Sequence, residues 1–486
     1  MKLLFVYPNQ IHQENVSLGL SYISSYVKQY GHETALMDYT WGGTVQDCVD
    51  KVEAFKPHVV GFCLTTGDLM YSLEVARAVK RVDSKIKVMF GASHATVAPE
   101  DSLKYGEVDM ACVGEAEYAV RDLLNHLSHE RDYYGTHHFW FKKDGDLISN
   151  PVDLLEMNLD SLPFPDRDLW DMDTYLNASN GNIDMVAGRG CPYKCTYCII
   201  PKLHEINAES KKQVRFRSVE NIVAEIRLLQ AKYPGRIKTV SFQDDVFAIQ
   251  KSFVAEFADK YPKACDVPFI CNGRVEALDE TMAELLAKAG CSALNLGIES
   301  GSETLRRNLM RRDMKNSHIV KAFKAAKRCK MKTNSYNIVG TPYETERDIW
   351  ETIKLNRDCE PDYLQVSIFQ PYPGTDLYTL SRESGWMATE ILPVSHKLTS
   401  IMEYPHMSKR EIVWHKKLFR YRVLKKTDQM KAMVLLLLDV NYELFVRFRT
   451  FLPTFVKRLL YVVLRKFSGG EMAKTSDTYL PRFEAR

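Results

Sequence analysis

The sequence lacks any apolar run long enough to cross a bilayer. Its longest uninterrupted apolar stretch, residues 432–438, is far shorter than the roughly 18–20 residues that a membrane-spanning helix needs. The N-terminal stretch MKLLFVYPNQ contains no long apolar segment followed by small residues, so we expect a first β-strand there and not a signal peptide. These absences predict a cytoplasmic protein.

Internal repeats and low-complexity tracts are also lacking, and the eleven cysteines are odd in number and mostly scattered. We therefore expect no disulfide framework, because lone cysteines of this kind are usually buried small hydrophobes in a reducing compartment. A length of 486 residues is too great for one compact domain, so two or three domains are expected. The hydrophobic content of 45% and charged content of 26% exclude a disordered or fibrous chain.

Three cysteines stand apart from the others because they lie close together in the segment GRGCPYKCTYCII, residues 188–200. Cys191, Cys195 and Cys198 have the spacing Cys-x3-Cys-x2-Cys, and the segment contains no fourth cysteine and no histidine. A structural zinc site built from them would lack one ligand. A cubane iron–sulfur cluster held by three thiolates instead keeps one iron open for an exogenous ligand.

This motif, with an aromatic residue, Tyr197, directly before its last cysteine, resembles the signature of the radical S-adenosylmethionine (radical SAM) superfamily. The resemblance implies a [4Fe-4S] cluster held by the three cysteines and SAM bound at the open iron. It also implies an electron donor of the flavodoxin or ferredoxin type as a partner.

Helical and strand patterns alternate downstream of the cysteines. SVENIVAEIRLLQAKY has apolar residues at helical spacing and precedes the strand-like IKTVSFQDDVF, while ETMAELLAKAG ends in Gly290, a common helix stop. Six such strands are expected, which predicts a parallel sheet with right-handed crossovers and functional groups at the carboxyl ends of its strands. We assign residues 181–395 to a partial (β/α)6 radical SAM barrel.

The resemblance places SAM contacts on polar residues at the ends of these strands. FQDDVF stands where the family often has Gly-Gly-Glu, which binds the methionyl amino group of SAM. The sequence therefore departs from the family pattern at this contact. Arg274 would pair with the methionyl carboxylate, which suits a bidentate guanidinium. For each residue, a helix cap or a surface polar group is the alternative. The implied SAM-binding set is Tyr197, Gln243, Asp244, Arg274, Glu299, Ser300 and Gly340.

Residues 1–140 form another unit in which strands and helices alternate. KLLFVYP, ETALMDY, HVVGFCLTT and KVMFGASHAT are predicted strands, and SLGLSYISSYVKQYG is a predicted amphipathic helix. This pattern is typical of a doubly wound, flavodoxin-like α/β domain, which binds ligands outside the carboxyl ends of its strands. One interpretation is a generic domain of this class that binds a nucleotide, or nothing.

The loops GASHATVAPE and VGEAE resemble loops of cobalamin-binding domains that precede radical SAM barrels. The resemblance implies cobalamin as a further cofactor and assigns its contacts to small and polar residues at the strand ends. They are Thr65, Thr66, Gly91, Ser93, His94, Ala95, Thr96, Gly114, Glu115 and Glu117.

Many cobalamin domains carry Asp-x-His-x-x-Gly after their first strand, and the histidine ligates cobalt. The corresponding loop here is QIHQEN, with Gln10 and Asn15 at the Asp and Gly places, so His12 alone matches. Ligating histidines usually have a carboxylate or similar partner on the other ring nitrogen. We therefore expect the lower face of cobalt to be unligated or to hold water, with ligation by His12 as the alternative.

Residues 141–180 are the expected linker, because LEMNLDSLPFPDRDLWDM carries Pro163 and Pro165 among acidic residues. Residues 396–470 form a basic amphipathic helical region, followed by a tail at 471–486. Between 404 and 470 there are fifteen Lys or Arg and four Asp or Glu, a net charge of +11, so the remainder carries −8.

We favour a helical cap over the barrel mouth for this basic region. A peripheral contact with the inner face of a membrane is the alternative. Binding to nucleic acid is not expected, because no recognised RNA-binding module accompanies the basic residues.

These motifs together imply an α/β enzyme of the cobalamin-dependent radical SAM type. The leading hypothesis is a methyltransferase that uses a 5′-deoxyadenosyl radical to activate an unactivated carbon and methylcobalamin as methyl donor. The alternatives are a cobalamin-dependent radical cyclase or oxidative ring-forming enzyme, and a cobalamin-free radical SAM enzyme that modifies RNA. The last usually groups extra cysteines for another cluster, and no such group is present. A small-molecule or lipid-like substrate is expected, and its identity stays open.

Overall fold

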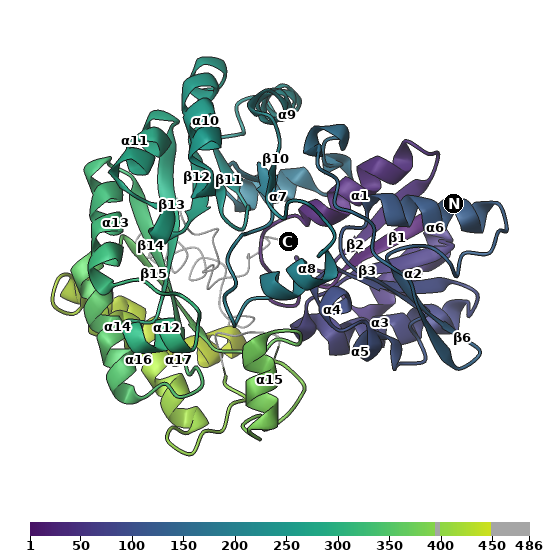
Figure 1. Ribbon diagram of the computed structural model, residues 1–486. Helices are drawn as coiled ribbons and strands as arrows, with labels where there is room; N and C mark the ends of the chain where they lie inside the picture. Colours follow the sequence, from purple (N-terminus) through teal and green to yellow (C-terminus); the bar gives the residue numbers. More distant parts are fainter. Residues whose placement is uncertain (394–398, 449–486) are drawn as a thin grey trace.

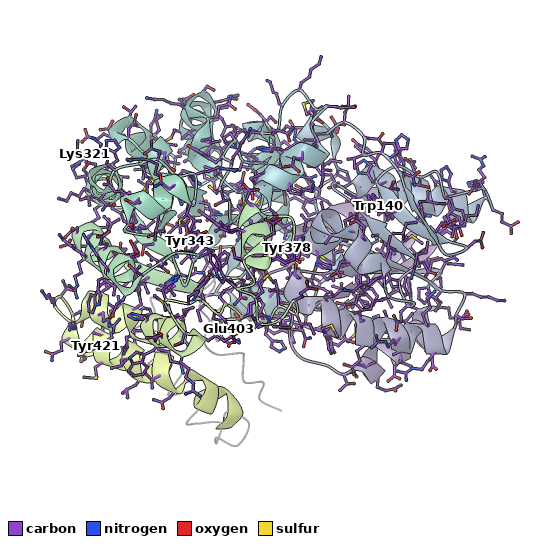
Figure 2. All side chains as sticks on the ribbon, turned by 60° about the horizontal axis from the view of Figure 1, so that its bottom comes forward. Trp140, Lys321, Tyr343, Tyr378, Glu403 and Tyr421 are labelled. Carbon is purple, nitrogen blue, oxygen red and sulfur yellow. The ribbon has the colours of Figure 1, made fainter. Side chains whose placement is uncertain are left out.

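The computed structural model of the protein describes residues 1–393 and 399–448, with side chains as far as residue 441. Two sheets lie side by side, one built by the first third of the chain and the other by the residues that follow the cysteine motif (Figure 1). Trp140 in the first sheet and Tyr421 near the end of the described chain mark opposite sides of the molecule (Figure 2).

The first sheet has the strand order β2-β1-β3-β4-β5-β6-β7. Its first five strands are parallel, and an order of 2-1-3-4-5 is that of flavodoxin-like folds, which bind ligands where the order reverses between β1 and β3. These strands are β1 (Lys2–Tyr7), β2 (Glu33–Asp38), β3 (Val59–Cys63), β4 (Lys87–Gly91) and β5 (Met110–Cys112).

Both faces of this sheet are covered because its strands are apolar on both sides. In β1, Leu3 and Phe5 join one buried cluster, while Leu4 and Val6 join another. Helices α1 (Leu18–Lys28) and α6 (Glu117–Ser128) pack together, as do α2 (Val45–Phe55) and α3 (Leu69–Val82). The predicted doubly wound α/β domain is confirmed.

The predicted strand KVMFGASHAT is wrong beyond Gly91. β4 ends there, and the short helices α4 (Ala92–Val97) and α5 (Pro99–Leu103) follow. The backbone of Ala92 adopts a left-handed φ of +68°, which turns the chain out of the sheet directly after the strand. The buried residues of α4 then pack against the ends of β4 and β5. A strand that continued past Gly91 would instead extend beyond the sheet.

The first sheet also extends into the predicted linker. The hairpin β6 (Phe139–Lys143) and β7 (Asp146–Ser149) pairs antiparallel with β5, so the predicted boundary at residue 140 falls inside β6. The rest of the linker folds back onto this domain. Trp170 donates its indole N–H to Ser21 at 2.7 Å, and the Tyr175 hydroxyl of α7 (Met172–Ala178) donates to Asp38 at 2.6 Å.

The second sheet has six parallel strands in the order β15-β14-β13-β12-β11-β8, which confirms the predicted partial (β/α)6 barrel. Helices cover its outer face (Figure 1). The strands are β8 (Asn182–Met185), β11 (Thr239–Phe242), β12 (Phe269–Gly273), β13 (Cys291–Glu299), β14 (Lys332–Val339) and β15 (Tyr363–Ile368). The helices are α9 (Val219–Lys232), α10 (Lys251–Ala264), α11 (Glu280–Lys288), α13 (Asn316–Arg328) and α14 (Glu346–Cys359).

The inner face of this barrel is polar. Asn272, Asn295 and Asn334 stand at one register across β12, β13 and β14, and their side-chain amides form hydrogen bonds of 3.0 and 3.3 Å. Parallel sheets that are packed on both faces consist mostly of apolar residues. A ladder of amides therefore gives the inner face a polar character that a second apolar layer would not have.

The C-terminal helices α16 (Lys409–Leu424) and α17 (Gln429–Phe448) continue the outer layer beside β15. Ile412 and Phe419 of α16 join a buried cluster with the apolar face of β15, and Arg420 holds Asp439 of α17 at 2.7 and 2.8 Å. In the described part of the basic region, α16 packs beside β15 and α14, α17 packs against α16, and the predicted cap over the barrel mouth stays a prediction. Without α16 the outer face of β15 would expose apolar residues. The remainder of the basic region, from residue 449, lies outside the described residues.

Among the helices that the structure describes, none combines the length and the apolar character needed to cross a bilayer.

Candidate functional site

The cysteine motif forms a loop between the two-residue strand β9 (Gly188–Arg189) and helix α8 (Ile200–Ile206). Cys191 and Cys195 are buried, Cys198 is half-buried, and the backbone N–H of Cys198 donates to the carbonyl of Cys195 at 3.1 Å. Burial raises the pKa of Cys198 to about 12, and the neighbouring thiols and Asp245 add to the rise. The loop therefore favours thiolates only where a strong positive charge, such as iron, compensates for burial.

The arrangement does not suit a single metal ion. Within the described ranges, no three His, Cys, Asp or Glu side chains converge to hold one ion. Iron–sulfur clusters are held by thiolates on separate irons, so the cysteine sulfurs need not meet at one point. Three neighbouring thiols on one constrained loop thus fit a multinuclear cluster, which is the group that the motif predicts.

Asp244 holds the backbone that leads into this loop. Its carboxylate accepts hydrogen bonds from the backbone N–H groups of Ala187 at 3.0 Å and Gly188 at 2.5 Å, and burial raises its pKa to about 7. A side chain at Gly188 would stand 2.6 Å from the carbonyl oxygen of Arg215, so the neighbouring segment needs glycine there. The structure gives Asp244 a role in positioning the loop, and a contact to SAM stays a prediction.

The other predicted residue at this strand end, Gln243, lies on the inner face of the barrel. Its amide donates to Asp184 at 2.8 Å and to Ser241 at 3.0 Å. These contacts fix the side chain beside the first strand of the barrel. Its predicted contact with the amino group of SAM is untested.

Arg274 reaches the cysteines directly from the end of β12. Its Nη1 donates to the sulfur of Cys195 at 3.1 Å, and its guanidinium lies 3.9 Å from the ring centre of Tyr193. Nε and Nη2 of the same group face the carboxylate of Glu276. The structure thus brings this predicted residue to the cysteine loop, where it contacts Cys195, and its contact with the SAM carboxylate stays a prediction.

Arg312 is a buried residue beside the predicted site that sequence analysis missed. It is almost fully buried, and its guanidinium donates to Glu299 at 2.9 Å, to the Tyr197 hydroxyl at 3.3 Å and to Glu276 at 3.4 Å. It also donates to the carbonyl of Gly297 at 2.9 Å. Two of the predicted SAM contacts, Tyr197 and Glu299, are therefore held by one buried cation.

Two other predicted SAM contacts are engaged within the protein. Ser300 is fully buried, and its hydroxyl accepts from the backbone N–H of Ser302 at 3.2 Å. The carbonyl of Gly340 accepts from the Tyr404 hydroxyl at 2.9 Å, and a side chain at Gly340 would stand 2.6 Å from Ile412. These contacts leave the ribose and adenine assignments as predictions.

The first domain contains a cavity of about 250 Å³ at the carboxyl ends of its strands. Four of the predicted cobalamin contacts line it, and the barrel contributes to its wall. Its mostly apolar walls at the ligand-binding edge of a flavodoxin-like sheet fit a buried part of a large cofactor. The lining includes the predicted Gly91, Gly114, Glu115 and Glu117, together with Leu18, Tyr22, Cys63, Val186 and Arg189.

The other predicted cobalamin contacts do not line this cavity. His94 is buried, with Nδ1 3.2 Å from the hydroxyl of Thr66 and Nε2 3.2 Å from Asp101, and the Thr96 hydroxyl accepts from the backbone N–H of Gly114 at 3.2 Å. These interactions stabilise the loops that frame the cavity. The remaining residues outside its lining are Thr65, Ser93 and Ala95.

His12 lies in the turn after β1 with a left-handed φ of +53°, and its Nδ1 is 3.0 Å from the carbonyl oxygen of Thr40. A backbone carbonyl can take the place of the carboxylate that sequence analysis found missing. Ligation of cobalt by His12 stays a prediction.

Four charged residues join the two domains, and sequence analysis did not foresee the pairing. Arg189 donates to Glu117 at 2.6 Å and to Glu115 at 3.0 Å, and Arg215 of the antiparallel strand β10 (Arg215–Phe216) also binds Glu115. We call these residues the interdomain quartet. Arg189 precedes Cys191 by two positions, so the quartet links the cavity wall to the start of the cysteine loop.

The family comparisons agree with this geometry. Residues 185–355 match the model of the Radical SAM superfamily, and residues 7–124 match that of the B12 binding domain. The chain is therefore a cobalamin-dependent radical SAM enzyme, as its motifs predicted. Its cofactors are a [4Fe-4S] cluster and SAM in the barrel, and cobalamin in the first domain.

Among curated relatives, the chain is 26% identical to an uncharacterized methyltransferase of Pyrococcus horikoshii, over 85% of this chain and 90% of that protein. It is 23% identical to the anaerobic magnesium-protoporphyrin IX monomethyl ester cyclase of Rubrivivax gelatinosus, over 78% and 69%. It is 24% identical to the hopanoid C-3 methylase of Methylococcus capsulatus, over 82% and 76%.

Solved structures share the fold. The cobalamin-dependent S-adenosylmethionine radical enzyme OxsB matches with a TM-score of 0.70 and 14% identity, over 96% of this chain and 75% of that one. The radical S-adenosylmethionine methyltransferase TsrM from Kitasatospora setae matches with a TM-score of 0.66 and 16% identity, over 79% and 75%.

Proposed function

We propose that the protein is a methyltransferase that transfers a methyl group to an unactivated carbon of a small-molecule substrate. When bound, the cluster and SAM supply a radical that abstracts hydrogen, and cobalamin supplies the methyl group. The observation that carries the proposal is the interdomain quartet, because it fixes the wall of the cobalamin cavity to the first residues of the cluster loop. Methyltransferases among the curated relatives support it.

The chain's own residues provide binding and orientation in this proposal. The cysteine loop holds the cluster, and Arg312 orients Tyr197 and Glu299 at its edge. The asparagine ladder Asn272–Asn295–Asn334 gives the inner barrel face amide donors and acceptors for a substrate. At the domain interface, the turn at Gly374 closely approaches Val97 of α4, where a side chain would stand 2.9 Å away. This packing helps to exclude water from the space between the cofactors.

A cyclase is the second candidate, because one similar relative is a magnesium-protoporphyrin IX monomethyl ester cyclase. The two candidates share cofactors and differ in the product. A product heavier by one CH2 than the substrate supports methylation, and a change of mass without CH2 supports cyclisation.

The test begins with anaerobic purification, reconstitution, and quantification of iron, sulfide and corrinoid. We expect iron and sulfide in about equal amounts, about four of each, and one corrinoid per chain. The triple variant Cys191→Ala, Cys195→Ala, Cys198→Ala should lose the cluster absorbance and keep the corrinoid. A reconstituted protein that binds no cobalamin would contradict the proposal.

The substrate test uses SAM labelled in its methyl group, a chemical reductant, and either a hopanoid or magnesium-protoporphyrin IX monomethyl ester. Labelled product with the wild-type protein, and none with the triple variant, is the expected result for an accepted substrate. A flavodoxin or ferredoxin is the proposed physiological electron donor, and it should replace the chemical reductant in this assay.

We also propose a peripheral membrane contact through α17. Met430, Met433 and Leu437 are exposed at helical spacing, and basic residues precede them. Sedimentation with vesicles of anionic phospholipid should capture the protein more than vesicles of neutral phospholipid. Equal, weak binding to both would exclude this contact.

A further inference from the structure

Arg274 contacts one cluster ligand and does so with a single donor atom. Nη1 lies 3.1 Å from the sulfur of Cys195, while Nε and Nη2 form a two-point contact with the carboxylate of Glu276. The side chain of Arg274 is only 11% exposed and that of Glu276 19% exposed. This charged group is therefore held beside the sulfur in a largely water-free place.

Two further contacts fix the guanidinium. The ring of Tyr193, which lies between the first two cysteines of the motif, stacks on it with a separation of 3.9 Å. Glu276 is itself held by the buried Arg312 at 3.4 Å. A chain of alternating charges, Arg274–Glu276–Arg312–Glu299, thus ends on the cysteine loop.

We propose that Arg274 acts through Cys195 to set the reduction potential of the cluster, and that Glu276 limits this effect. Hydrogen bonds to cluster sulfurs and nearby positive charge stabilise the reduced, more negative cluster, and so raise its potential. The inference rests on the assignment of the cluster to the three cysteines. It goes beyond methyl transfer, because it concerns how easily the cluster accepts an electron.

The geometry of the Arg274 donors favours a role in setting the cluster potential over the predicted pairing with the SAM carboxylate. A guanidinium has five N–H donors, and Glu276 occupies the face formed by Nε and Nη2. A bidentate contact to SAM through this face would require Glu276 to leave, and one through Nη1 and Nη2 would use the atom that donates to Cys195. The contact to Cys195 requires no rearrangement.

The experiment measures the midpoint potential of the reconstituted cluster without SAM, by a redox titration followed by electron paramagnetic resonance. Arg274→Gln should shift the potential to a more negative value, and Arg274→Lys, which keeps the charge without the fork, should shift it less. Glu276→Gln should shift it in the positive direction, because it removes a negative charge beside Arg274. Arg307→Gln, at an exposed ion pair with Asp313, is the matched control and should leave the potential unchanged.

The proposal predicts that Arg274→Gln and Glu276→Gln shift the midpoint potential in opposite directions. A loss of folding alone would not produce shifts of opposite sign. Iron and sulfide content is measured in every sample. If both variants keep the wild-type potential without SAM, and Arg274→Gln binds SAM more weakly, the proposal is overturned. Arg274 would then pair with the SAM carboxylate, as the sequence predicted. A wild-type protein that assembles no cluster would instead contradict the proposed function itself.

Discussion

Nη2 of Arg189, in the barrel, lies 2.6 Å from Oε1 of Glu117, in the cobalamin-binding domain. Both side chains line the cavity at the strand ends of the first domain, and Arg189 also binds Glu115. The side chain of Glu117 is 7% exposed and that of Arg189 18% exposed, so solvent screens this pair only weakly. One arginine therefore belongs to the cavity wall and to the strand that enters the cysteine loop.

Arg189→Gln should weaken cobalamin binding and reduce stability, because it leaves Glu117 buried without its cation. Breaking a fully buried pair costs about 3–5 kcal/mol, and the partial exposure here makes the expected loss smaller. We expect at least about a tenfold rise in the cobalamin dissociation constant, which corresponds to about 1.4 kcal/mol. Equilibrium dialysis and thermal unfolding provide the measurements. Lys260→Gln, at an exposed ion pair with Glu220, is the control, and equal behaviour of both variants would refute the coupling.

Arg312→Lys should destabilise the protein far more than Arg311→Lys. A lysine at 312 has no planar fork and cannot serve Glu299, Glu276 and the carbonyl of Gly297 together. We expect a loss of about 1–3 kcal/mol in the free energy of unfolding at 312, because the charge remains but buried acceptors lose their donors. Arg311 forms an exposed pair with Asp376, where about 0–1 kcal/mol is expected. Denaturant unfolding measures both, and similar losses would show that the buried network contributes little.

The free energy of unfolding should depend on pH through Glu344. Burial raises the pKa of this carboxyl from 4.5 to about 8, although the backbone N–H groups of Gly340 and Thr341 donate to it. Between about pH 4.5 and 8 the folded state keeps a proton that the unfolded state loses, so stability falls as the pH rises. The slope contributed by one such proton is about 1.4 kcal/mol per pH unit.

Glu344→Gln should remove this slope, since glutamine stays neutral and can still accept the two hydrogen bonds. Its stability relative to the wild type should therefore increase from pH 5 to pH 8. Glu346→Gln, two positions along the chain at a side chain that is 66% exposed, should keep the wild-type slope. Parallel pH profiles for the wild type and Glu344→Gln would rule out the buried proton.

Gly340→Ala separates the packing role of this glycine from its predicted contact with adenine. The φ of +80° disfavours alanine, and the new Cβ would stand 2.6 Å from Ile412, so we expect a loss of about 1–3 kcal/mol in stability. Adding Ile412→Ala should relieve the clash and leave the backbone strain together with the cavity cost of the second change.

SAM binding by the Gly340→Ala and Ile412→Ala double variant is the deciding measurement. Weak binding by a folded double variant supports the adenine contact. Normal binding indicates that Gly340 serves the packing of α16 alone. Isothermal titration with SAM, using Ile412→Ala alone as the reference, gives the comparison.

The parts of the fold that depend on local pattern were predictable. The alternation of apolar strands with amphipathic helices indicated both sheets, and the cysteine spacing indicated the cluster loop. The limit of local pattern is visible at Ala92, where a left-handed residue ends β4 and the chain continues as a helix. Residues 92–97 have the composition of either element, and only packing against the strand ends decides between them.

Arg312 and the interdomain quartet mark the other limit. Arg312 lies in a run of basic residues whose sequence is typical of a solvated surface. It is buried because the segment between α12 (Glu303–Asn308) and α13 places it against Glu299. Arg189 and Glu117 are 72 residues apart in the chain. No periodicity connects such pairs, because their attraction becomes strong only where the meeting of the domains removes water from between the charges.

The sequence by itself determined the class of protein, since the spacing of a motif and the period of hydrophobic residues are local properties that can be read directly along the chain. It also predicted that Cys191, Cys195 and Cys198 hold the iron–sulfur cluster. The tertiary structure decided how the two cofactor sites are joined, which cation holds Tyr197 and Glu299, and that Arg274 contacts Cys195. The physical reason is that electrostatic interactions strengthen only when burial removes water, and burial depends on the assembled fold.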